Sequence, residues 1–557
     1  MKQQFKYIIG AGALMASVSV GCKKSFFNRP PESQSTVGTY YQTTAEVQSS
    51  TDILYAAPWF GLNGKALLAI GDLQAGNAVC YAGTDGEFDA FNNFSEGNAT
   101  LAVQSAWNSL YTVVAQANAL LNNLPGAVPA SVPAAVVNNA LGEARVLRAA
   151  AYFYLVRNFG NVPIITNPTA FTGTFQTVPT NPVSDVYKFI ILDLLYGEAN
   201  CTPGVANTGH VSSASASGLL AKVYLYEQNY DSARIEAEKV INSGEFGLAG
   251  LDFTSINYTN QFELVGNNSN ESMIALQWTS NGGYGFGNQI QSVIADGENG
   301  NYLTGTGDGY GELGPSWDLQ DAFVADADTG TYPNVGRRHG IIMLGGDYYP
   351  ELHKAAGGYT VPLTVDCQGV HASLKKYVVG TPADNNGESA AQATSNNTYI
   401  LRYADIYLIE AEAIIGKAAG VAAGTAIPFS TTSADPTALK YLNLVRQRAG
   451  LAPLTSFTYQ QLFNERRLEL AIEGEFWYDL QRLDGFNNAH HPIAEAIIGA
   501  QNRGNSSGAG TAANNYTDYT RNTLYVTPTD ANFLLPPPAT DAEADPMLLQ
   551  PPVPYKF

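Results

Sequence analysis

Two segments of the chain combine aromatic rings with neutral amide side chains. The first spans Val79–Thr100 and the second spans Trp278–Gly311. A sugar ring presents an apolar C–H face and a rim of hydroxyl groups, so an aromatic ring flanked by amides matches both parts of its surface. We therefore predict that these segments hold binding loops for an uncharged carbohydrate. The aromatic residues expected to contact it are Tyr81, Phe91, Tyr284, Phe286, Tyr302 and Tyr310.

Each of these rings has an alternative place in the interior of its own loop, and Tyr81 and Tyr284 are the first choices for ligand contact. Trp278 ends a short apolar run, and Trp317 opens an expected helix over Ser316–Val324. Both tryptophans are therefore predicted to be structural. The run Asp347-Tyr348-Tyr349 is a third candidate for the ligand platform.

A second group of residues contains carboxylates of the type that carry out acid–base catalysis. Glu465, Glu469 and Glu473 recur every four residues and share one face of a helix. A carboxylate pair is the machinery of glycoside hydrolysis. Because Arg466 and Arg467 lie between them, we predict ion pairs between packed helices instead, and no catalytic residue. The same interpretation applies to Glu143, Arg145 and Arg148, and helix-packing roles are expected for Asp405, Glu410 and Glu412.

The sequence predicts no cofactor and no metal site, with one alternative left open. Asp326 and Asp328, followed by Thr329-Gly330, carry oxygen ligands suited to calcium, although a solvated loop is the preferred interpretation. No zinc-helix motif, nucleophile elbow or P-loop is present. Cys80, Cys201 and Cys367 are too widely spaced for a disulfide framework, and their pairing stays open.

The composition excludes several classes of partner. The 557 residues carry 29 Lys+Arg against 49 Asp+Glu, a formal net charge of −20, so nucleic acid is a poor partner. Only 14% of the residues are charged, against about 25% in an average protein. Asn, Gln, Ser, Thr and the 32 tyrosines must therefore supply much of the polar surface, which suits uncharged polyhydroxyl ligands.

The segments that position these loops show helical periodicity and come in pairs. Their apolar residues recur at three-four spacing, and Ala221, Tyr224, Tyr230 and Ala233 follow the pattern of a tetratricopeptide unit. We predict a mostly α-helical scaffold of tetratricopeptide-like repeats with a large irregular region that contains short strands. The expected helices span 107–124, ending at Pro125, then 142–159, 213–228, 230–243, 402–417, 436–449 and 458–483.

The N-terminus is predicted to be a lipoprotein export signal. Lys2 and Lys6 precede a short apolar run, and Ser19-Val20-Gly21-Cys22 follows as a lipobox with Cys22 as the acylated residue. The alternative is an ordinary secretory signal that is cleaved elsewhere. No later segment is long and apolar enough to span a bilayer.

These observations together predict six segments. They are a signal peptide (1–21), an acylated N-terminus and tether (22–44), a first scaffold part with a binding loop at 79–100 (45–243), an irregular ligand-binding insert (244–400), a second scaffold part (401–486), and an irregular C-terminal segment that packs on the scaffold (487–557).

Short motifs in a fixed order resemble the SusD/RagB family of outer-membrane nutrient-binding lipoproteins of Bacteroidota. The matching residues run from the N-terminus to the C-terminus: Cys22-Lys23-Lys24, Gly71-Asp72, Trp107 with Tyr111, Gly142 to Ala149, Phe159 to Pro163, Leu220 to Leu225, Leu401 to Asp405, Asn443 to Arg446, Glu465 to Leu470 with Glu473-Gly474, and Leu534 to Pro538.

The resemblance implies a lipid-anchored outer-membrane protein, exposed at the cell surface, that is not an enzyme. It implies a helical scaffold of four tetratricopeptide-like units that lies over a TonB-dependent transporter of the SusC type. An oligosaccharide or polysaccharide would be captured there for import.

Two other functions remain as alternatives. A helical-repeat adaptor would bind peptide or protein in its concave groove. A glycosidase would use the Glu465–Glu473 carboxylates. The identity of the sugar and the oligomeric state beyond a transporter complex are not specified by the sequence.

Overall fold

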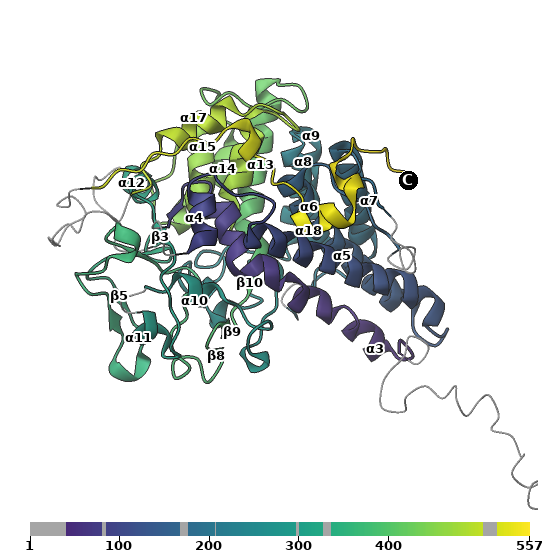
Figure 1. The fold of residues 1–557 in the computed structure, drawn as a ribbon, viewed down its shortest axis with the longest axis horizontal. Helices are drawn as coiled ribbons and strands as arrows, with labels where there is room; N and C mark the ends of the chain where they lie inside the picture. Colours follow the sequence, from purple (N-terminus) through teal and green to yellow (C-terminus); the bar gives the residue numbers. More distant parts are fainter. Residues whose placement is uncertain are drawn as a thin grey trace, which may run out of the picture.

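The computed structural model describes residues 40–80, 85–167, 177–205, 208–296, 300–326, 336–504 and 521–557. The predictions for Cys22, Tyr81 and Asp328 lie outside these residues. In Figure 1 the helical part fills the upper and right-hand regions, and the segments between α9 and α13 form a loop-rich part at the lower left.

The larger helices form one continuous array. Each packs on the next in the order α5, α6, α7, α8 and α9, and α13 and then α14 continue the array after α9. The array is built from α5 (Leu101–Ala127), α6 (Ala134–Phe159), α7 (Val183–Asn200), α8 (Ser213–Tyr226), α9 (Tyr230–Ser243), α13 (Tyr403–Ala419) and α14 (Pro436–Arg448). The prediction of a mostly helical, tetratricopeptide-like fold is therefore confirmed.

Local sequence signals account for several helix starts. The side chain of Asp435 accepts hydrogen bonds from the Thr437 and Ala438 amides and caps α14, with Pro436 at the first helical position. Thr458 and Gln461 form the expected capping box at the start of α15 (Tyr459–Glu469). The shorter helices are α3 (Thr44–Ser49), α4 (Gly86–Asn92), α10 (Ile290–Ile294), α11 (Gly300–Thr304), α12 (Trp317–Asp326), α16 (Phe476–Gln481), α17 (Pro492–Ala500) and α18 (Ala539–Ala544).

Several predicted helix bounds are wrong; α5 and α6, for example, begin at Leu101 and Ala134 rather than at 107 and 142. Pro125 does not end its helix, because it lies in the last turn of α5 and the helix continues to Ala127. The single helix predicted over 458–483 is broken between α15 and α16, where Ile472 and Gly474 adopt positive φ angles of 63° and 79°. Such a backbone conformation leaves the right-handed helix.

The segment between α15 and α16 contacts the Gly71-Asp72 motif from the N-terminal part of the chain. The buried carboxylate of Asp72 accepts hydrogen bonds from the Ile472 and Gly474 amides at 2.9 and 2.7 Å. Burial raises the pKa of Asp72 to about 6. At Gly71 a Cβ atom would lie 2.2 Å from the Cα of Gly474, so only glycine permits this approach. The Gly71-Asp72 motif thus contacts the segment of Ile472 and Gly474, which lies about 400 residues later in the sequence.

The strands are short and pair only in twos within the described residues. All six pairs are antiparallel. They are β1 (Ala78–Val79) with β3 (Gly314–Pro315), β2 (Ser272–Leu276) with β10 (Thr398–Arg402), β4 (Ile342–Met343) with β7 (Ser373–Leu374), β5 (Tyr348–Tyr349) with β6 (Tyr359–Thr360), β8 (Ser389–Ala390) with β9 (Ala393–Thr394), and β11 (Thr432–Ser433) with β12 (Phe457–Thr458). The β2–β10 pair is where the loop-rich part leaves and rejoins the helical array.

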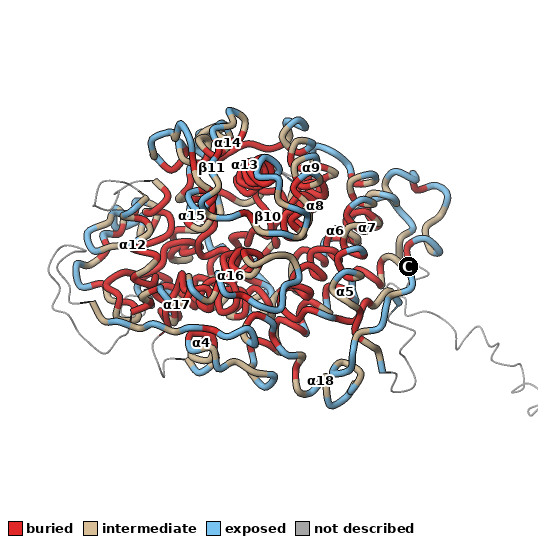
Figure 2. Tube along the Cα trace, turned by 90° about the horizontal axis from the view of Figure 1, so that it is seen from above, coloured by how far each residue is buried: buried red, intermediate tan, exposed pale blue. Residues whose placement is uncertain are grey.

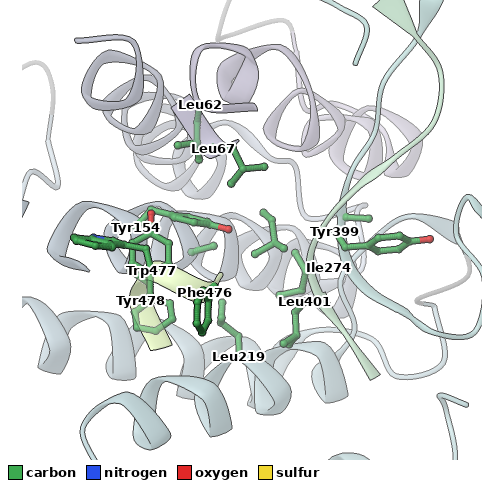
Figure 3. Packing of buried hydrophobic residues seen from close by; sticks show 14 of the residues in the cluster. Leu62, Leu67, Tyr154, Leu219, Ile274, Tyr399, Leu401, Phe476, Trp477 and Tyr478 are labelled. Carbon is green, nitrogen blue, oxygen red and sulfur yellow. The ribbon is translucent and has the colours of Figure 1, made fainter. Parts of the chain in front are cut away.

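One hydrophobic core joins the scaffold to the loop-rich part. Figure 3 shows Leu62 and Leu67 from the N-terminal segment above Tyr154, Phe476 and neighbouring buried residues. The strands β2 and β10 add Ile274 and Leu401 to the same cluster. In Figure 2 the centre of the molecule is buried and exposed residues lie along its outer loops. The two parts therefore share their interior.

No single helix among the described residues is long and apolar enough to cross a membrane, although one bent pair, Thr44–Trp59 with Leu62–Leu73, meets the criterion of length and composition. Leu54, Trp59, Leu68 and Leu73 of this pair are fully buried in the core.

The predicted ion pairs exist, and they are buried where the loop-rich part joins the array. Arg402, at the end of β10, donates to Glu473 at 2.8 Å and to Glu469 at 2.6 Å. It also donates at 2.8 Å to Glu271, which precedes β2. Arg448, at the end of α14, donates to the same Glu271 at 2.8 Å and to Glu469. The helices α14 and α15 and both ends of the loop-rich part therefore meet in one network.

The arginines of the network favour the ionised form of Glu469 and Glu473 by lowering the pKa of each. Burial alone favours the neutral acid, but the charges of Arg448, Arg402 and Arg337 outweigh it and lower the pKa of Glu469 to about 2. A second cluster lies nearby, where Arg466 pairs with Asp405 and Asp479. None of the three predicted glutamates is accessible for hydrolysis, because each is at least 96% buried.

We expect the substitution Glu469→Gln to lower the free energy of unfolding by about 3–5 kcal/mol, because it leaves buried arginines without their counter-charge. The measurement is the urea unfolding midpoint at neutral pH. The matched control is Glu238→Gln, which removes a largely exposed partner of Arg234 and should change stability by less than about 1 kcal/mol. Equal effects of the two substitutions would show that the buried network does not stabilise the junction.

Candidate functional site

An open cavity of about 460 Å³ lies between the helical array and the loop-rich part, and it brings together two of the predicted ligand-binding tyrosines. Tyr284 and Tyr310 both line it. The other side chains at its wall come from six separate segments: Phe60, Lys65, Glu87, Ser105, Gln289, Ser292, Glu312 and Gln392. The cavity combines aromatic rings with amide and hydroxyl groups, as the sequence predicts for a carbohydrate platform.

Tyr284 is the most exposed ring at the cavity, with 67% of its surface accessible. It stands edge-on against Phe60, with ring centroids 5.0 Å apart. Glycines shape the loop that carries it: Gly283 and Gly285 adopt φ angles of 66° and 94°. These left-handed conformations turn the chain sharply on either side of Tyr284 and project its ring outward.

Tyr310 is held in place from two sides. Its backbone amide donates to the Ser292 carbonyl at 2.7 Å, and its hydroxyl lies 3.2 Å from the donating Gln392 Nε2. Asp308 links these segments, because its carboxylate accepts hydrogen bonds from the Ser292 hydroxyl at 2.5 Å and from the backbone amide of Gln392 at 2.6 Å. Burial opposes ionisation of Asp308, but these hydrogen bonds outweigh it and lower its pKa. The ring of Tyr310 is therefore held in position by the protein itself.

The charge at the cavity is negative. Lys65 donates at 3.0 Å to Glu312 and also pairs with Asp85. Glu87 adds a third carboxylate, whose pKa is raised by burial and by the charge of Asp85. The charge of Lys65, the one lysine among the described residues that line this cavity, is thus neutralised by Asp85 and Glu312. The sequence of both predicted binding segments, 79–100 and 278–311, contains no lysine or arginine.

The remaining predicted rings lie elsewhere. Phe286 is exposed and belongs to the same loop as Tyr284, but it does not line the cavity. Tyr302 stacks on His353 with ring centroids 4.0 Å apart, outside the cavity. Phe91 is fully buried, because α4 turns Phe88 and Phe91 into the core, so its prediction as a ligand contact is wrong. Trp278 and Trp317 are buried, as predicted.

Sequence reasoning missed Phe60, Lys65 and Gln392. Phe60 and Lys65 lie in or beside the irregular helical turns of residues 57–73, and Gln392 lies in the turn between β8 and β9. No local pattern marks these residues, because they reach the cavity only through the packing of segments that are distant in sequence.

The calcium alternative gains no support from Asp326. Its carboxylate accepts from Arg337 at 3.0 Å and from Arg446 at 3.2 Å. Over the described ranges, no group of three or more His, Cys, Asp or Glu side chains is arranged to hold a metal ion.

Two family profiles match the chain. The profile described as "SusD family" matches residues 368–553, and the profile described as "Starch-binding associating with outer membrane" matches residues 88–225. Together they cover parts of both the helical array and the C-terminal segment.

Relatives and solved structures match over longer stretches. A SusD-like protein of Bacteroides ovatus is 30% identical over 567 residues, which covers 98% of this chain and 97% of that protein. SusD-like protein P2 of Formosa agariphila is 28% identical over 481 residues, covering 82% and 86% respectively. A crystal structure with xylogluco-oligosaccharide is 28% identical, with a TM-score of 0.76 over 92% of this chain and 99% of that one.

The similarity to the Bacteroides ovatus protein runs from end to end of both chains, and the similarity in fold covers the scaffold and the loop-rich part alike. The protein belongs to the SusD family.

Proposed function

We propose that the protein is a surface-exposed lipoprotein of the outer membrane that binds neutral oligosaccharides in the Tyr284 cavity and delivers them uncleaved to a SusC-like, TonB-dependent transporter. The observation that carries this proposal is the cavity itself, where two exposed tyrosines lie beside glutamine and serine side chains. A structure with 28% identity and a TM-score of 0.76 contains a xylogluco-oligosaccharide, which supports the same class of ligand.

The electrostatics of the cavity favour an uncharged sugar. A uronate or a sulfated sugar brings an anion that needs a cationic partner, as carboxylate and sulfate do in proteins. Lys65, however, is occupied by Asp85 and Glu312. Like charges in a partly buried site repel, so Glu87 and Glu312 would disfavour an anionic ligand.

Binding without cleavage is consistent with the positions of the carboxylates. The glutamates of α15 that suggested hydrolysis are buried partners of arginines, as described above. Incubation of the purified protein with neutral oligosaccharides should therefore release no new reducing ends.

The proposed lipid anchor rests on Cys22 within its lipobox. One matching family profile is described as associating with the outer membrane, which supports this location. Several acyl chains on one cysteine hold a protein to a membrane far more firmly than a single chain does.

We expect Tyr284→Ala to weaken the binding of a neutral oligosaccharide such as a xylogluco-oligosaccharide about tenfold or more, because an aromatic anchor of a binding site commonly contributes over 1 kcal/mol. Isothermal titration calorimetry measures the affinity. The melting temperature should not change, since the ring is 67% exposed.

The matched control for this experiment is Tyr525→Ala, which removes a ring that is 57% exposed on the C-terminal segment and does not line the cavity. Its affinity should equal that of the unmodified chain. Wild-type affinity together with an unchanged number of sites in the Tyr284 variant would exclude this cavity as a binding site. Retention of peptides, with no neutral glycan bound, would favour the adaptor alternative.

The charge argument gives a separate expectation about ligand class. In affinity electrophoresis, neutral xyloglucan or laminarin should retard the protein, whereas polygalacturonate should not, even at low ionic strength. Equal retardation by polygalacturonate would contradict the assignment of a neutral ligand.

The partner proposal is tested on native membranes. Purification of the protein from detergent-solubilised outer membrane should recover a TonB-dependent transporter in the same complex. A Cys22→Ser variant should lose its membrane attachment while the isolated protein keeps its affinity for sugar. Recovery of the native protein without any transporter would contradict delivery to such a channel.

A further inference from the structure

A second hollow, of about 690 Å³, lies beside the β5–β6 hairpin and shares no lining residue with the Tyr284 cavity. Its wall includes the third aromatic candidate of the sequence, Tyr348. The side chains that matter for recognition are Asn257, His339, Asp347, Tyr348, Glu351 and Arg448. They come from three separate parts of the chain: the loop before β2, the region around the β5–β6 hairpin, and the end of α14.

The ring of Tyr348 is half exposed and fixed in position. Its hydroxyl donates to the Gly357 carbonyl at 2.6 Å. At Gly358, a Cβ atom would lie 2.4 Å from the Tyr348 hydroxyl oxygen and about as close to the ring, so the ring lies directly against a glycine. The hairpin thus holds an aromatic ring at the edge of the hollow with little conformational freedom to lose on binding.

Arg448 leaves one hydrogen-bond donor for a ligand. Its side chain is 99% buried, and its two terminal nitrogens donate to Glu271 and Glu469. The Nε–H group has no hydrogen-bond partner among the described residues, although Arg448 lines the hollow. A buried donor without a partner is unfavourable, and an oxygen of a ligand would relieve it.

The acidic groups of the hollow have cationic neighbours within the protein. Asp347 pairs with Arg338, and the Glu351 carboxylate lies 3.6 Å from Lys375, which also pairs with Glu263 at 2.9 Å. His339 stacks on Tyr349 with centroids 4.1 Å apart, and burial lowers its pKa, so the imidazole is neutral at pH 7. The hollow therefore offers hydrogen-bond donors and acceptors, and Arg448, the one arginine among the described residues that line it, is already paired with carboxylates, so the hollow would not attract an anionic ligand.

We propose that this hollow is a second binding subsite for a neutral sugar, in which the sugar ring lies on Tyr348. A hydroxyl oxygen of the sugar accepts from Arg448 Nε, and other hydroxyl groups donate to the carboxylate of Glu351. The proposal rests on the proposed function in the class of ligand, but it concerns a different part of the surface. One molecule of the protein then binds two oligosaccharides independently.

The test is a set of four proteins titrated with the same xylogluco-oligosaccharide: the unmodified full chain in detergent, Tyr284→Ala, Tyr348→Ala, and the double variant. Calorimetry should give two sites for the unmodified chain, one for each single variant and none for the double variant. The melting temperature confirms that each variant is folded. Tyr348→Phe retains the ring, so it should retain the second site.

The outcomes separate the two proposals. A single site that Tyr284→Ala abolishes and Tyr348→Ala leaves intact overturns the second subsite but supports the main one. A single site that only Tyr348→Ala abolishes overturns the main cavity instead. If the unmodified chain binds neither xylogluco-oligosaccharide nor laminarin oligosaccharides, both proposals fail.

Discussion

The buried arginine–glutamate network at the junction of the two parts is the constraint on which the rest of the structure depends. Arg402 and Arg448 share Glu271 and Glu469, so the ends of β10, α14 and α15 are fixed relative to the start of β2. Buried charges tolerate only their paired arrangement, because any displacement leaves a charge without a partner in a medium of low dielectric. The loop-rich part therefore leaves and rejoins the helical array at a rigid point.

This rigidity is what a binding site made of loops requires. Loops carry side chains to a ligand, but they lose conformational entropy if the ligand must order them. Here Asp308 binds three segments of the wall together, and Gln392 holds the hydroxyl of Tyr310. The scaffold anchors the loops at one fixed junction. The hydrogen bonds of Asp308 and Gln392 then hold the exposed ring of Tyr310 in position. An array of paired helices and a set of irregular loops are thus held together as one unit.

Much of the fold follows from local sequence. The three-four spacing of apolar residues located the helices of the array except α7, and the Asp435 and Thr458 caps marked the starts of α14 and α15. The alternation of arginine with Glu465, Glu469 and Glu473 correctly indicated ion pairs between helices. Local pattern failed at Ile472 and Gly474, because the contact that bends the chain there comes from Asp72, 400 residues away.

The sequence by itself determined the class of the fold and the aromatic and amide composition of the loops, because periodicity and composition are local properties. Only the tertiary structure decided which aromatic rings face solvent. Phe91 and Tyr284 stand in similar runs of aromatic and amide residues, yet one fills the core and the other lines a cavity. The difference lies in what packs against each segment, and that depends on residues such as Phe60 and Gln392 that are adjacent only in space.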